Sequence, residues 1–110
     1  MTTRLLLIGF VLLASGAIVR ASWPQDDPKT LYDDNCAKCH GVRGLPPKTM
    51  KAKFPKIFTF DATFVTSHSE DSIVKVLTRG KDEDMVSFKD KLTPDQMKIV
   101  AKYVRALGSK

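Results

Sequence analysis

The chain has 110 residues, of which 18 are Lys or Arg and 12 are Asp or Glu, for a formal net charge of +6. This length suits one small domain and excludes two. Charged residues make up 27%, with only six Gly and six Pro, which argues against a disordered or low-complexity chain. Two cysteines are too few for a disulfide-rich scaffold or, by themselves, for a four-ligand zinc site. We therefore expect a packed globule.

Residues 1–21 have the pattern of a secretory signal peptide. Arg4 is followed by an apolar run over residues 5–19, and cleavage after Ala21 is plausible because small residues surround it. The run is shorter than the ~20 residues that span a bilayer as a helix, so an uncleaved membrane anchor is the weaker alternative. We expect export to the periplasm and a mature domain of residues 22–110. The core of a domain this small gains stability from a covalent cross-link or a bound cofactor.

The first helix of the mature chain is predicted over residues 28–38, with Asp27 as N-cap and Pro28 at its first position. Its apolar face carries Leu31, Tyr32, Cys36 and Cys39. Residues 41–66 lack sustained periodicity and are predicted to form a long loop. Such a loop is unusual in a compact domain, so either a strand at 57–60 or a large flat cofactor has to organise its apolar side chains.

A second helix is predicted over residues 70–79. Ser67 or Ser69 can cap its N-terminus, and Gly80 is placed to end it. A polar break over residues 81–84 then leads into a non-periodic segment that begins at Met85.

The last helix has the strongest sequence signals. Thr93 and Gln96 form a capping box with Pro94 at the first helical position, and Gly108 is predicted to stop the helix. One apolar stripe contains Met97, Val100, Ala101, Val104 and Leu107. With no parallel-strand pattern elsewhere, the sequence predicts an all-α fold.

The C-x-x-C-H motif of residues 36–40 carries the chemistry. This spacing is the pattern of covalent c-type haem attachment, in which each of Cys36 and Cys39 adds to one haem vinyl group and His40 lies under the iron. The alternatives are a redox dithiol, a zinc knuckle with His68 as a further ligand, and a simple disulfide. The adjoining histidine and the export signal favour haem c, with its iron, over all three.

The whole mature chain resembles the class I monohaem cytochromes c of bacteria. The resemblance rests on residues 31–41, on residues 85–96 and on residues 103–107. It implies a small cytochrome c fold with about three main helices and long loops around one covalently bound haem. Two positions depart from the family pattern: Val86 stands where Pro commonly follows the distal Met, and Pro28 stands where a Gly often allows close crossing of the terminal helices.

The resemblance also assigns Met85 as the sixth ligand of the iron. Its position in a loop between two predicted helices agrees with that role, because the sulfur is free to point at a ring held at His40. Met97 falls on the apolar stripe and is predicted to be core, and Met50 is predicted to pack within the loop. His68 is predicted to face solvent, with bis-histidine ligation left as an alternative.

The family also suggests how the haem is held by the surrounding chain. A carbonyl of the 45–47 loop is expected to accept from the second ring nitrogen of His40. Trp23, Tyr32 and Arg43 are candidates for contacts with the haem propionates.

Filled axial positions at His40 and Met85 predict one-electron transfer rather than enzymatic catalysis. Six basic residues and no acids occupy residues 38–56, a segment suited to steering redox partners with acidic docking faces. Export and the lack of a recognised motif argue against nucleic-acid binding. We expect a periplasmic carrier, monomeric or in transient complexes, with membrane contact only if residues 1–21 are retained. The alternatives are a haem subunit docked on an oxidoreductase and, if Met85 is not a ligand, a ligand-binding or catalytic haem protein.

Overall fold

The computed structural model of the protein describes residues 15–16 and 26–110. The predicted signal peptide therefore lies outside the described residues except at Ser15 and Gly16, as does Trp23. Within the described ranges, no helix is both long and apolar enough to cross a bilayer.

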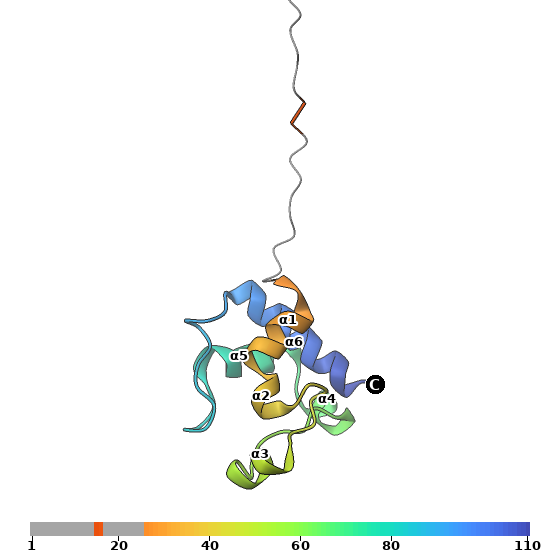
Figure 1. The fold of residues 1–110 in the computed structure, drawn as a ribbon, viewed down its shortest axis with the longest axis vertical. Coiled ribbons are helices and arrows are strands. Elements are labelled where there is room, and N and C mark those ends of the chain that lie inside the picture. The colour runs from red at the N-terminus through yellow and green to blue at the C-terminus, as the bar shows by residue number, and fades with distance from the viewer. Residues whose placement is uncertain (1–14, 17–25) are drawn as a thin grey trace, which may run out of the picture.

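Six α-helices form the regular structure of residues 26–110 (Figure 1). They are α1 (Pro28–Asn35), α2 (Ala37–His40), α3 (Lys48–Lys53), α4 (Ala62–Ser67), α5 (Glu70–Arg79) and α6 (Pro94–Gly108). In this part of the chain, extended pairing is limited to a single bridge between Lys81 and Met85. The prediction of an all-α fold with long connecting loops is confirmed.

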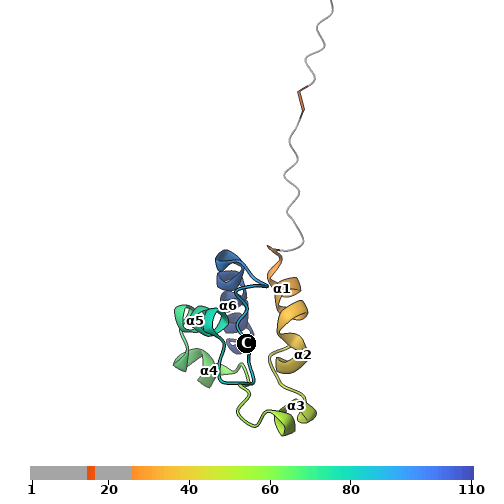
Figure 2. The ribbon, with the colours of Figure 1, turned by 90° about the vertical axis from the view of Figure 1, so that its left-hand side faces the viewer.

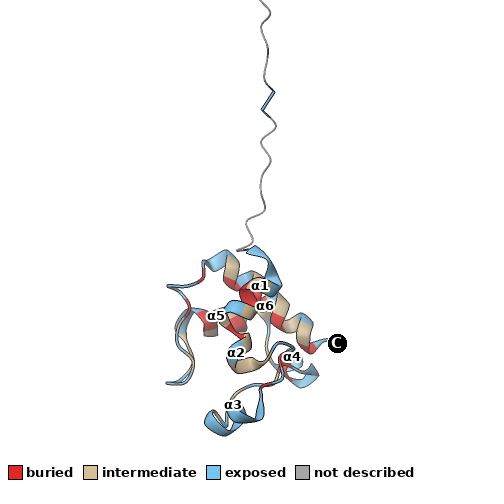
Figure 3. Ribbon diagram, in the orientation of Figure 1, coloured by how far each residue is buried: buried red, intermediate tan, exposed pale blue. Residues whose placement is uncertain are grey.

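Helix α6 is the centre of the packing. It contacts α1, α4 and α5, and Figure 2 shows α1 and α5 on opposite sides of it. Tyr32 of α1 and Val100 of α6 are fully buried, and the rings of Tyr32 and Tyr103 lie 5.2 Å apart. The helix-crossing contact thus forms with Pro28 as the first residue of α1. Figure 3 shows that α3, in contrast, is largely exposed.

The buried position of Tyr32 corrects one prediction. Its hydroxyl donates to the carbonyl oxygen of Gly41 at 2.6 Å, so this side chain ties α1 to the end of α2. A wholly enclosed phenol with its hydrogen committed to the backbone is a core residue and not a propionate partner.

The capping box of α6 forms as predicted. The Thr93 hydroxyl accepts from the Gln96 N–H at 3.1 Å, and the Gln96 side chain accepts from the Thr93 N–H at 2.9 Å. Met97 is 2% exposed and lies in the core. Helix α6 ends at Gly108 as predicted, and a Cβ there would lie 2.6 Å from Cγ2 of Val65. Its role is close packing of α6 against α4.

The predicted helix over residues 28–38 is divided at Cys36. This residue has φ −124° and ψ −37°, which ends α1, and α2 then continues to His40. The backbone nevertheless stays connected across the break, because the Cys36 N–H donates to the Tyr32 carbonyl at 2.8 Å and the His40 N–H donates to the Cys36 carbonyl at 2.9 Å. The bend buries Cys36 and brings the end of α2 beside the cavity described below.

Two short helices that the sequence pattern does not predict lie in residues 48–67. Helix α3 follows Pro47, and α4 begins after Asp61, whose carboxylate accepts from the Phe64 N–H at 2.9 Å. Each has six residues, less than two turns, which is too short to produce a recognisable apolar period. Residues 57–60 form no strand in the described structure.

Helix α5 agrees with its prediction at both ends. The Ser69 hydroxyl, rather than that of Ser67, caps it by accepting from the Ser72 N–H at 3.2 Å. Gly80 ends the helix with φ +77°, a left-handed conformation that favours glycine.

Candidate cofactor site

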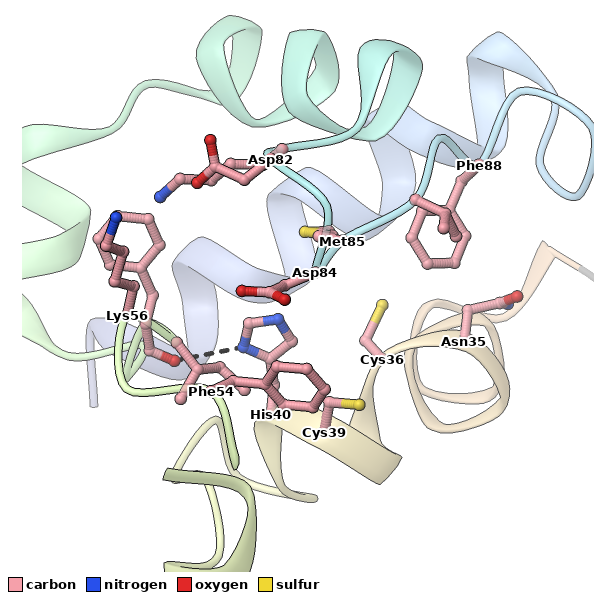
Figure 4. A pocket seen from close by; sticks show the side chains of 14 residues that line it. Asn35, Cys36, Cys39, His40, Phe54, Lys56, Asp82, Asp84, Met85 and Phe88 are labelled. Carbon is pink, nitrogen blue, oxygen red and sulfur yellow. Dashed lines mark hydrogen bonds between the residues drawn. The ribbon is translucent and has the colours of Figure 1, made fainter. Parts of the chain in front are cut away.

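An apolar cavity with two adjoining lobes lies between α2, the 54–60 segment and the loop that joins α5 to α6. The lobes have volumes of about 210 and 180 Å³, and Figure 4 shows the side chains that line the first. Both are lined by Cys36, His40, Phe58, Lys81 and Met85. The structure thus brings together three of the four predicted site residues at both lobes, and Cys39 lines the first lobe.

The two cysteines of the motif are free thiols in the structure. Cys36 is buried at the bend between α1 and α2, and Cys39 is half-buried one helical turn later. Burial, with a smaller contribution from Cys39, raises the pKa of the Cys36 thiol to about 12. In Figure 4 both sulfur atoms stand on the cavity side of α2. The pair can therefore attach to one edge of a flat molecule.

The imidazole of His40 is fixed by two contacts. Nδ1 lies 3.2 Å from the Phe58 carbonyl oxygen, and the ring stacks on that of Phe60 with centroids 4.6 Å apart. Burial lowers the pKa of His40, opposed in part by the hydrogen bond to Phe58. The ring is therefore neutral near pH 7, and donation from Nδ1 to the carbonyl leaves Nε2 with a lone pair for a metal.

The carbonyl that holds His40 is not in the predicted place. The 45–47 loop was expected to provide it, but Phe58 does. The Leu45 carbonyl instead packs against Gly41, where a Cβ would lie 2.1 Å from its oxygen. Gly41 has φ +83°, so the chain turns tightly here and directs that carbonyl toward the backbone.

Met85 is presented by a short hairpin. The Lys81 N–H donates to the Met85 carbonyl at 2.8 Å, and the Met85 N–H donates to the Lys81 carbonyl at 3.1 Å. The following residues are tied to α5, because the Ser87 hydroxyl donates to the Thr78 carbonyl at 2.6 Å and the Phe88 N–H donates to the Leu77 carbonyl at 2.7 Å. These bonds hold the loop in place although Val86 stands where the family commonly has Pro.

Of the other candidate iron ligands, only His68 lines the cavity. Met97 is in the core, where the Thr78 hydroxyl lies 3.4 Å from its sulfur, and Met50 lies on α3 and does not line the cavity. His68 was expected to face solvent, but it is half-buried and lines the second lobe. No periodic pattern marks His68, Phe58 or Lys81 as lining residues, because they come from loops and a helix end.

The donor set fits covalent haem. Two free thiols, one neutral imidazole and one thioether sulfur border a single cavity whose remaining walls are mostly apolar. Among the described residues, no three His, Cys, Asp or Glu side chains gather as a metal cluster, and a zinc knuckle needs four ligands. The fold and this donor set define a c-type cytochrome.

The chain belongs to the family described as "Cytochrome C oxidase, cbb3-type, subunit III", which matches residues 24–104. Membership confirms the resemblance to monohaem cytochromes c and the cofactor, covalently bound haem c with its iron.

Curated relatives agree with this assignment. The chain is 30% identical over 82 residues to the cbb3-type cytochrome c oxidase subunit CcoP of Azospirillum brasilense, covering 73% of this chain and 27% of that protein. It is 25% identical over 99 residues to the cbb3-type subunit FixP of Bradyrhizobium diazoefficiens, covering 90% of this chain and 33% of that protein. The chain thus spans a third or less of the length of these relatives.

Two solved structures are similar over their whole length. The KustC0563 c-type cytochrome is 33% identical, with a TM-score of 0.66, and the match covers 74% of this chain and 96% of that one. A tyrosine-to-phenylalanine mutant of that cytochrome is 32% identical, with a TM-score of 0.65 and coverage of 74% and 98%. The described helices therefore share the fold of a small c-type cytochrome.

Proposed function

We propose that this protein is a one-electron carrier whose haem is attached through Cys36 and Cys39, with His40 and Met85 as the axial ligands. The observation that carries the proposal is the convergence of these four side chains, from α2 and the bend before it and from a loop 45 residues after His40, on one cavity (Figure 4). No single element brings them together, so their meeting depends on the tertiary fold.

The haem supplies reversible one-electron chemistry between Fe(III) and Fe(II). Residues of the chain hold the two axial ligands of the haem in place. His40 is held by Phe58 and Phe60, and Met85 by its hairpin, so both ligands keep their positions when the charge changes. A thioether opposite an imidazole favours the reduced state more than a second imidazole does. With both positions filled, no open site is left for a substrate, which supports electron transfer rather than catalysis.

The surface near the cavity supports transient docking of an acidic partner. The six basic side chains of residues 38–56 are all exposed, and several lie on or beside α3. They are Lys38, Arg43, Lys48, Lys51, Lys53 and Lys56, and we name them the basic surface. Lys56 also lines the first lobe. Positive charge there would speed association with an acidic redox protein by electrostatic steering.

A second candidate is a haem subunit of an oxidase, favoured by the names of the curated relatives. We place either form in the periplasm after export, with membrane contact only if residues 1–21 are retained. The native mass of the protein from its periplasmic fraction separates a free carrier from a docked subunit, since only the free carrier elutes at the mass of the single chain.

The test of the proposed ligands uses protein from cells competent in haem attachment. The wild type should carry one haem by mass and show the weak near-infrared sulfur-to-iron band when oxidised. Met85→Ala should keep the haem mass, lose the band and bind carbon monoxide or cyanide much more tightly. Met97→Leu is the matched control, because it changes a buried methionine that does not line the cavity.

Each result bears on a different part of the proposal. A colourless protein at its bare polypeptide mass would remove haem attachment altogether. Retention of the near-infrared band in Met85→Ala would remove Met85 as the ligand, and the ligand-binding alternative would then take its place if the wild type already binds carbon monoxide.

A further inference from the structure

A haem in this cavity introduces two propionate carboxylates into mostly apolar surroundings. Buried carboxylates are costly unless cations or hydrogen-bond donors meet them. Tyr32 is committed to Gly41, and Arg43 lines neither lobe. The partners of the propionates are therefore to be sought among the residues that do line the cavity, an inference that rests on the proposed haem attachment.

The two lobes differ in charge. The first lobe, which Cys39 lines, has two carboxylates in its wall, Asp82 and Asp84, beside the basic groups Lys56 and Lys81. The described lining of the second lobe has no carboxylate, and its basic side chains are Lys81, His68 and His40. Since His40 is the proposed iron ligand, Lys81 and His68 remain available to an anion in the second lobe.

The chemistry of haem separates its two kinds of substituent. The vinyl groups that join to cysteine sulfur and the propionates lie on opposite edges of the porphyrin. Cys39 lines only the first lobe, whereas His68 lines only the second. A ring joined to Cys39, and to Cys36 where the two lobes meet, would have its opposite, propionate edge toward the lobe that contains His68 and lacks acids.

Lys81 and His68 meet at one aromatic ring. The Lys81 Nζ lies 3.8 Å from the centroid of the Phe58 ring, and the His68 ring lies edge-on to it with centroids 5.0 Å apart. His68 also stacks on Phe64, and its Nδ1 lies 3.0 Å from the Phe64 carbonyl oxygen, which leaves Nε2 for another partner. In the described part of the chain no ion pair joins Lys81 to an acid.

We propose that Lys81 and His68 together form the anchor for a haem propionate, on the side of the cavity away from Cys39. The Lys81 ammonium donates to the carboxylate. In its protonated form His68 donates through Nε2 while Nδ1 stays on the Phe64 carbonyl. Pairing the carboxylate with these donors reduces the negative charge felt by the iron, and so it raises the reduction potential.

The test measures the reduction potential of the holoprotein at constant pH and ionic strength. Lys81→Gln and His68→Gln should each lower the potential, by up to about tenfold in the equilibrium constant, or 59 mV for one electron. Lys91→Gln is the matched control: Lys91 lies 5.5 Å from the centroid of the Phe88 ring in a similar cation–π contact, but it does not line the cavity. Its potential should stay at the wild-type value.

A second readout observes the carboxylate itself. With haem labelled with ¹³C at the propionate carboxyls, the carboxylate stretch in the oxidised-minus-reduced infrared spectrum should shift in Lys81→Gln and His68→Gln and not in Lys91→Gln. Unchanged stretches, or potentials that move no more than in the control, would overturn the anchor. Loss of a bis-imidazole signature in His68→Gln would also overturn it, because His68 would then be an iron ligand. All these outcomes require attached haem, so failure of attachment remains a separate result.

Discussion

Gly80 lies directly against Met85: a Cβ at Gly80 would stand 2.7 Å from the Met85 carbonyl oxygen and 2.9 Å from the Ser87 nitrogen. Gly80 has φ +77° and ends α5, so one residue both terminates a helix and admits the hairpin that presents the proposed ligand. Position 80 therefore controls the geometry of the sulfur more directly than Val86, which is 61% exposed.

Gly80→Ala should therefore move the Met85 loop. The left-handed backbone and the overlap with Met85 should together lower the free energy of unfolding by about 2–3 kcal/mol. The near-infrared band of the oxidised protein should weaken, and the affinity for cyanide should rise. Lys75→Ala, on an exposed position of α5, is the control and should change stability by less than about 0.5 kcal/mol. An unchanged band in a destabilised Gly80→Ala protein would show that the loop does not depend on this contact.

The sequence predicted the elements whose signals are local. The capping box of α6 and the glycine after α5 act within a few residues, and the structure has them where the pattern placed them. The short helices α3 and α4 were missed because six residues give no period. The end of α6 at Gly108 was predicted, but its close approach to Val65, 43 residues earlier, was not, because no local pattern contains that contact.

In the candidate site, too, the sequence predicted the residues of a local motif and not those that tertiary packing brings in. The C-x-x-C-H motif is contiguous, so Cys36, Cys39 and His40 are visible in the sequence. Phe58 holds His40 from 18 residues away, and His68 reaches the cavity from the end of α4. Nothing in the residues 57–68 indicates which carbonyl or ring turns inward, because the packing of α4 on α6 settles it.

Tyr32 predicts an alkaline limit to stability. Burial, with a smaller effect of Cys36, raises the pKa of this phenol above its ordinary value near 10. Below pH 10 the phenol is protonated in both states and stability does not depend on its ionisation. Above about pH 10 the unfolded chain loses a proton that the folded chain retains, so the free energy of unfolding falls as pH rises.

Denaturant titrations between pH 7 and 11 measure this effect. Tyr32→Phe should be less stable than the wild type at pH 7 by about 1–3 kcal/mol, because the Gly41 carbonyl loses its donor. That difference should shrink above pH 10. Tyr103→Phe, at a half-exposed neighbouring ring, is the control for the loss of a phenol that does not bond to Gly41. A constant difference for Tyr32→Phe would contradict the buried phenol as the cause.

Gly108→Ala tests the contact between α4 and α6. The added methyl would approach Cγ2 of Val65 to 2.6 Å and the Asp61 carbonyl oxygen to 2.8 Å, which forces the helices apart. A gain in helix propensity of about 1 kcal/mol opposes this overlap, so we expect a net loss of about 1–2 kcal/mol in thermal or denaturant unfolding. Ser109→Ala, one residue beyond and exposed, should be close to neutral. A Gly108→Ala protein as stable as the wild type would mean that α4 adjusts freely.

The basic surface predicts a charge preference that depends on salt. Lys51 and Lys53 are exposed on α3, and the neighbouring Lys56 lines the first lobe. Lys51→Gln/Lys53→Gln should slow oxidation of the ferrous protein by ferricyanide, an anion, about threefold or more at 10 mM salt. Oxidation by a cationic cobalt complex should become faster, and both effects should nearly vanish at about 0.5 M salt because the charges are screened.

The control is Lys98→Gln/Lys102→Gln. It removes the same charge from exposed positions of α6, whose residues line only the second lobe. Equal effects from the two pairs would show that net charge, and not the basic surface, governs the encounter.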